Sequence, residues 1–181
     1  MKAASLLFIA LSLLFLAGCA TTPSTHATAS RATHKGQHMT VRTTAYTPNE
    51  KGGGGHCNAC GQRLHFGGDP YSAAADWSWL PLGTQFYMAT TGHTYVIEDY
   101  GSALVGKKTI DLYMPTRAAM REWGARNVDI EILQWGSPVM SLKLLEPRQK
   151  ADYVRTMVTC LRHNKGPMLA STKAGSGTAL P

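Results

Sequence analysis

Three aspartates, Asp76, Asp99 and Asp111, are the residues of this sequence best suited to proton chemistry. They are spaced by 23 and then 12 residues (99 − 76 and 111 − 99), and the last two flank one glycine-containing loop in EDYGSALVGKKTIDLYM, residues 98–114. When two carboxylates are held close together, one is expected to stay protonated near neutral pH and to exchange that proton with a ligand. The structural alternative for any single aspartate is a turn or a helix cap.

A second candidate group is the segment HCNAC, in which two residues separate Cys57 from Cys60 and His56 comes first. A disulfide between Cys57 and Cys60 is expected in an oxidising compartment. Zinc binding by this pair with His56 or His65 is an alternative, but neither a second CxxC nor an HxxxH with matching spacing follows the pair in the sequence. We therefore expect no metal. A Cys–His nucleophile is the third and weakest alternative.

Short segments rich in β-branched and aromatic residues must position these groups. The predicted strands are residues 41–47, 84–90, 94–100, 109–114 and 128–135. A short helix is expected between an N-cap at Thr116 and a stop at Gly124, and a second helix from about Pro147 to His163. Several short strands with one small helix favour a closed or nearly closed barrel.

The strand predicted at residues 109–114 has a direct consequence for Asp111. Because side chains alternate between the two faces of a strand, Ile110 and Leu112 should point away from the face that carries Asp111. If Ile110 and Leu112 pack in the core, Asp111 points into a groove.

The first nineteen residues resemble a bacterial lipoprotein signal peptide. An apolar run ends in Ala17 and Gly18, and Cys19 follows as the expected lipidation site. A plain secretory peptide is the alternative. Residue Ala20, rather than an aspartate, follows Cys19, which favours the outer membrane, facing the periplasm, over the inner membrane. The expected location is therefore the bacterial cell envelope.

Composition divides the rest of the chain into three parts. Residues 20–39 are rich in Thr, Ser, Ala and His and predict a flexible tether, residues 40–164 predict one folded domain, and residues 165–181 predict a flexible tail. The formal net charge of +7 comes without a basic run flanked by stacking aromatics, so no nucleic-acid partner is expected. An exported basic domain suits an anionic polymer such as the cell wall, and scattered solubilising charge is the alternative.

The order of four segments resembles the three-aspartate (3D) domain family. The segments are TAYT, AAADWSWLPLGT, VIEDYGSALVGKKTIDLYMPT and WGARNVDIEIL. That family places one aspartate before a PLGT turn, a second in a D-x-G-G-A-I-x-G loop and a third in I-D-L-F, which correspond here to Asp76, Asp99 and Asp111. Ser102 replaces the second glycine of the loop, and Asn58 replaces a threonine of a T-A-x-G element. The resemblance covers about residues 41–133.

The resemblance implies a mainly β fold, a six-stranded double-psi β-barrel with one short inserted helix and a C-terminal helix. It also implies a lytic transglycosylase, which cleaves the β-1,4 bond between N-acetylmuramic acid (MurNAc) and N-acetylglucosamine (GlcNAc) in peptidoglycan and forms 1,6-anhydro-MurNAc. In that reaction one carboxyl group protonates the leaving oxygen and then accepts a proton from the MurNAc 6-hydroxyl group, so no water attacks.

The same resemblance assigns roles to residues. Asp111 is expected to be the catalytic acid and base, and Asp99 to tune or position it. The expected substrate-binding residues are Asp76, Asn58, Tyr46, Gly101 and Ser102. No cofactor is expected, and the expected partners are peptidoglycan glycan strands and, through the lipid anchor, a membrane, with the protein a monomer. The alternatives are a non-catalytic, expansin-like glycan-binding module and a structural surface lipoprotein.

Overall fold

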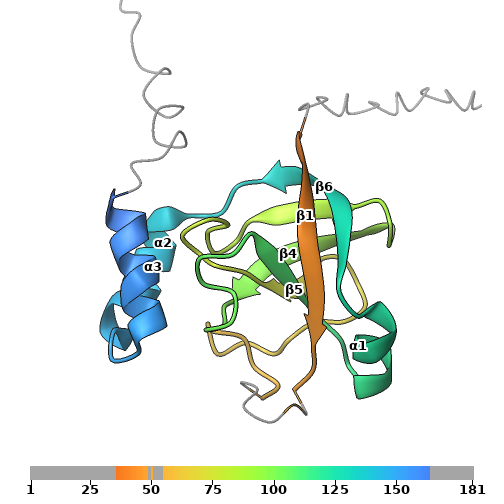
Figure 1. Ribbon diagram of the computed structural model, residues 1–181, viewed down its shortest axis with the longest axis horizontal. Helices are drawn as coiled ribbons and strands as arrows, with labels where there is room; N and C mark the ends of the chain where they lie inside the picture. The colour runs from red at the N-terminus through yellow and green to blue at the C-terminus, as the bar shows by residue number, and fades with distance from the viewer. Residues whose placement is uncertain (1–35, 49, 51–54, 164–181) are drawn as a thin grey trace, which may run out of the picture. The chain divides into compact units, whose positions relative to one another are not determined.

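The computed structural model describes residues 36–48, 50 and 55–163 (Figure 1). Cys19, the expected signal peptide and the expected tail at 165–181 lie outside these residues. The strands are β1 Gln37–Tyr46, β2 Tyr71–Ala74, β3 Gln85–Met88, β4 His93–Asp99, β5 Thr109–Tyr113 and β6 Arg126–Gln134. The helices are α1 Arg117–Trp123, α2 Pro138–Leu145, the 3₁₀ helix η1 Glu146–Arg148 and α3 Asp152–His163.

The six strands form a closed barrel in the order β1-β5-β2-β4-β3-β6. Two neighbouring pairs, β1 with β5 and β2 with β4, are parallel, and the other four pairs are antiparallel. Closure leaves no free sheet edge. The expected fold is thereby confirmed, and the two parallel pairs are consistent with the double-psi topology.

Strand β5 carries the alternation that the sequence predicts. Ile110 and Leu112 are fully buried in the barrel core, whereas Asp111 between them is half-buried. The parallel register with β1 places Thr44 opposite Asp111. The core therefore fixes the direction of the Asp111 side chain, as expected.

Helix α1 begins and ends where the sequence predicts. The Thr116 hydroxyl accepts a hydrogen bond from the Ala119 N–H at 3.1 Å, and Gly124, at φ 63°, ends the helix. The Trp123 indole N–H donates to the Thr43 hydroxyl at 3.2 Å, which ties the helix to β1. The position of α1 beside the barrel is thus set by a cap at each end and by one anchoring side chain.

The C-terminal region differs from the single helix expected from Pro147 to His163. Helix α2 begins at Pro138, after the N-cap Ser137, and α3 begins only at Asp152. The two helices pack against each other (Figure 1). Four buried apolar side chains of α3 join the barrel core, namely Val154, Met157, Val158 and Leu161. The end of this helix at His163 was predicted correctly, and its expected start near Pro147 was wrong.

Two strands also differ from expectation. Strand β2 was not predicted, because alanines make up half of Tyr71–Ala74 and have little β propensity. Strand β1 begins at Gln37, so residues 37–39 belong to the barrel and not to the expected tether. Within the part of the chain that the structure describes, the helices are too short or too polar to cross a membrane.

Candidate active site

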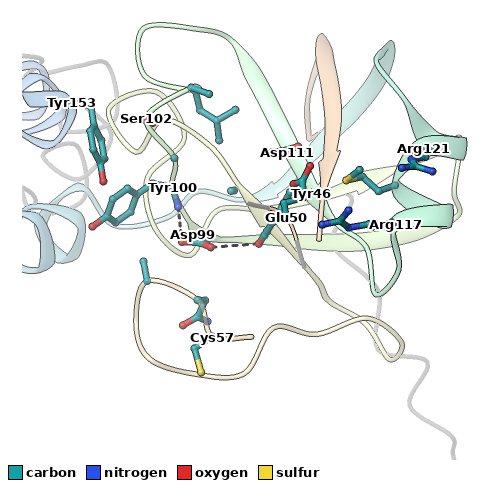
Figure 2. A pocket seen from close by; sticks show the side chains of 17 residues that line it. Tyr46, Glu50, Cys57, Asp99, Tyr100, Ser102, Asp111, Arg117, Arg121 and Tyr153 are labelled. Carbon is teal, nitrogen blue, oxygen red and sulfur yellow. Dashed lines mark hydrogen bonds between the residues drawn. The ribbon is translucent and has the colours of Figure 1, made fainter. Parts of the chain in front are cut away.

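A pocket of about 850 Å³ opens beside the barrel (Figure 2). Strands, loops and two helices contribute to it. Its lining residues come from the ends of β1, β2 and β4, from β5, from Glu50, from the loops at 57–59 and 100–104, and from α1 and α3. Six of the seven residues predicted to act on or bind a substrate line it, namely Tyr46, Asn58, Asp99, Gly101, Ser102 and Asp111. The seventh, Asp76, does not.

Asp111 enters the pocket from the middle of β5. One of its carboxylate oxygens accepts a hydrogen bond from the Thr44 hydroxyl on β1 at 2.7 Å. Burial raises the pKa of Asp111 from 3.8 to about 6, the Thr44 hydrogen bond lowers it, and the nearby negative charge of Glu50 raises it. A carboxyl group with a pKa near 6 can both donate and accept a proton close to neutral pH.

Asp99 ends strand β4 and reaches the same pocket. Its Oδ1 accepts the N–H of Tyr100 at 2.9 Å, and its Oδ2 lies 3.5 Å from the Tyr46 hydroxyl, which donates to it. Burial is the main reason that the pKa of Asp99 rises from 3.8 to about 6, and the charge of Glu98 adds to it. Hydrogen bonds from Tyr100, Tyr46 and the Ala59 backbone lower that pKa in part.

Tyr46 lies beside both aspartates (Figure 2). Burial and the negative charges of Asp99 and Asp111 raise the pKa of its hydroxyl group, so it stays protonated and acts as a donor. We expected the neighbouring carboxylate to raise the pKa of one member of the pair, but the charges that contribute are those of Glu98 for Asp99 and of Glu50 for Asp111. The raised pKa values therefore come first from burial, and a tyrosine is the shared neighbour of the two carboxyl groups.

Asn58 organises the loop that forms the wall nearest Cys57. Its side-chain oxygen accepts the N–H groups of Cys60 and Gln62, each at 2.9 Å. Only 6% of the residue is exposed, and its buried side-chain NH₂ group has no hydrogen-bond partner among the described residues. A buried donor without a partner is costly, and the residue that carries it lines the pocket.

Cys57 and Cys60 are both free and exposed in the structure, so the expected disulfide is not formed there and stays a prediction. Burial raises the pKa of the Cys60 thiol. Across residues 36–48, 50 and 55–163, no group of three or more His, Cys, Asp and Glu side chains is arranged to hold a metal ion. The zinc alternative finds no support in that part of the chain.

Asp76 is buried, 3% exposed, and does not line the pocket. Its Oδ1 accepts hydrogen bonds from the N–H and the hydroxyl group of Ser78, at 2.8 and 2.7 Å, and its Oδ2 accepts the N–H of Gly106 at 2.8 Å. Gly106 has φ +76°, a conformation that favours glycine. Asp76 thus ties the end of the loop that carries Gly101 and Ser102, and contact with a substrate stays a prediction.

Several pocket residues were not predicted from the sequence. Glu50 follows β1, Arg117 and Arg121 come from α1, and Tyr100 and Tyr153 come from the loop after β4 and from α3. Arg117 and Arg121 could have been paired from the sequence, because residues four apart on the predicted helix lie on the same face. No local pattern marks Glu50 or Tyr153, because only the tertiary fold brings them to the pocket.

Comparison with known proteins adds two findings. Residues 71–134 match the family model of the 3D domain. This segment contains Asp76, Asp99 and Asp111. The chain is also similar to the cell wall shaping protein YabE of Bacillus subtilis (strain 168), with 36% identity over 98 residues, covering 54% of this chain and 23% of that protein. The chain therefore matches less than a quarter of the length of that relative.

Proposed function

We propose that this chain, which contains a 3D domain, acts on the glycan strands of peptidoglycan as a lytic transglycosylase. The observation that carries the proposal is the environment of Asp111. Its side chain lines a pocket of about 850 Å³, is held by Thr44, and has a pKa of about 6 because of burial. The similarity to a cell wall shaping protein supports the class of substrate.

In the proposed reaction, protonated Asp111 donates its proton to the glycosidic oxygen as the bond from that oxygen to MurNAc C1 breaks. The MurNAc 6-oxygen then bonds to C1, and its proton passes to the Asp111 carboxylate, which restores the acid. The reaction consumes no water and gives 1,6-anhydro-MurNAc. A pKa near 6 suits a group that serves in both directions.

The other pocket residues support this step. Asp99 and Tyr46 form a hydrogen-bonded pair that lines the same pocket as Asp111. Asn58 lines the pocket, and its NH₂ group has no partner among the described residues, which supports a role as donor to a substrate oxygen such as the carbonyl of an N-acetyl group. We further propose that the enzyme works as a monomer.

The products of purified sacculi digested in water enriched in heavy oxygen test this proposal. We expect anhydro-ended fragments without heavy oxygen at the new end, whereas a hydrolase would incorporate it. Digests with Asp129→Asn are the matched control, since Asp129 is an exposed residue of β6 that does not line the pocket. Binding to sacculi without release of any fragment would favour the non-catalytic glycan-binding module instead.

The proposal extends to the location of the protein. We propose that Cys19 carries a lipid and that the residues after it tether the barrel to the outer membrane, facing the periplasm. Labelled palmitate should be incorporated into the wild type and not into Cys19→Ala, which should leave the membrane fraction. Membrane association that survives this substitution would contradict the lipid anchor.

A further inference from the structure

One face of α1 borders the pocket. Arg117, Met120 and Arg121 line it, and their spacing of three and four residues places them on the same side of the helix. Figure 2 shows Arg117 and Arg121 at one end of the pocket, and Tyr100 and Tyr153 toward the other. The pocket is therefore cationic at its α1 end and aromatic at its α3 end.

Arg121 has no side-chain partner among the described residues. Within the part of the chain that the structure describes, no acidic or carbonyl oxygen lies in ion-pair or hydrogen-bond range of its guanidinium group. Two other exposed arginines are engaged, since Arg162 pairs with Glu146 at 2.7 Å and Arg126 lies over the ring of Trp123. An arginine without a protein partner at the edge of a pocket is available to an anionic group of a ligand.

The carboxyl groups of the pocket limit where such an anion can bind. Glu50, Asp99 and Asp111 all line the pocket and would repel it when ionised. The cationic α1 face is the part of the wall that attracts it, and a guanidinium group binds a carboxylate through two parallel hydrogen bonds. A phenol ring, by contrast, offers its flat face to a sugar ring.

We infer that the α1 face, through Arg121 with Arg117 beside it, binds a carboxylate that the substrate carries on its MurNAc residue. This inference rests on the proposed function and deepens it. MurNAc carries a lactyl group, whose carboxylate is free in strands without peptides, and in peptide-bearing strands the carboxylates belong to the peptide. Binding at α1 sets the direction of the strand, because the neighbouring sugar then extends toward Tyr100 and Tyr153.

Calorimetric binding to the full chain tests this inference with three probes. The probes are the disaccharide GlcNAc–MurNAc without a peptide, the same disaccharide with its peptide, and chitobiose, which has no carboxylate. We expect Arg121→Gln to weaken binding of at least one carboxylate probe by about tenfold and to leave chitobiose unchanged. Arg121→Lys should restore part of the loss, because the positive charge remains.

The control is Arg42→Gln, which removes the same charge from an exposed residue of β1 outside the pocket. A loss confined to the peptide-free disaccharide identifies the lactyl carboxylate, and a loss confined to the peptide-bearing one identifies the peptide. Equal binding of every probe by wild type and Arg121→Gln overturns the inference. Failure of the wild type to bind any probe overturns the proposed function itself.

Discussion

At the scale of single residues, the site depends on how burial and hydrogen bonds balance at two carboxyl groups. Burial raises the pKa of Asp99 and of Asp111 to about 6, and donors from the protein oppose this rise at both. Asp99 has three such donors, whereas Asp111 has the Thr44 hydroxyl group. The Thr44 hydroxyl group is therefore the one donor that lowers the pKa of Asp111 among the described residues.

Thr44→Val tests that dependence. Valine has the shape of threonine but cannot donate to Asp111, so the pKa of Asp111 should rise by about half a unit to one unit. The measurement is the pH dependence of the carboxyl carbon signal of Asp111 by NMR. Thr40→Val is the matched control, since the Thr40 hydroxyl donates to the exposed Asp129. An Asp111 titration that is the same in Thr44→Val and wild type would show that the hydrogen bond has no such effect.

The motif residues of the site were predictable from the sequence, and the residues around them were not. Asp99, Asp111 and Tyr46 lie in segments whose spacing matches the 3D domain, and all three line the pocket. Glu50 raises the pKa of Asp111 from a position that only the fold brings near it. The sequence suggested repulsion between the carboxyl groups of Asp99 and Asp111, but it does not reveal that Tyr46 lies beside both of them.

At the scale of elements, strands rich in β-branched and aromatic residues were predicted well. The strand that forms only because neighbouring strands pair with it was not predicted. Strand β5 has buried β-branched and aromatic residues, whereas β2 is held between β4 and β5 despite its alanines. The start of α2 had a readable signal, because Ser137 caps it and Pro138 stands at its first position. Pro147 instead lies in η1, between the two helices.

The loop from Tyr100 to Lys107 depends on Asp76. Asp76→Ala leaves the N–H groups of Ser78 and Gly106 without their acceptor, so it should lower the free energy of unfolding by about 2–4 kcal/mol. The amide proton of Gly106 should exchange faster with solvent, and activity should fall with it. Urea denaturation and hydrogen exchange measure the two effects.

Asp129→Ala provides the comparison, because Asp129 is exposed and accepts only from Thr40 in the described residues. A wild-type exchange rate at Gly106 in Asp76→Ala would contradict the positioning role. It would also strengthen the earlier expectation that Asp76 contacts the substrate directly.

At the scale of the whole molecule, the site should make stability depend on pH. In the folded protein Asp99 and Asp111 have pKa values of about 6, raised from 3.8, so the folded state binds more protons than the unfolded state between these values. Their contribution to stability is fully present below about pH 4 and is lost as the pH rises through about 6. The double variant Asp99→Asn/Asp111→Asn removes this dependence.

We therefore expect the double variant to be more stable than the wild type at pH 8 by about 1–3 kcal/mol and nearly equal to it at pH 4. Urea denaturation of the two proteins at the two pH values measures the difference. A gap that is the same at pH 4 and pH 8 would mean that burial does not raise these pKa values.

The central claim is that Asp111 is the catalytic acid and base of a peptidoglycan lytic transglycosylase, and the initial rate of anhydro-MurNAc release from purified sacculi tests it most directly. Asp111→Asn keeps the shape of the side chain and removes the exchangeable proton, so the rate should fall by about 10² to 10⁴ while binding to sacculi persists. Asp99→Asn should reduce the rate less and move its pH optimum. Release by Asp111→Asn at the wild-type rate would contradict the account.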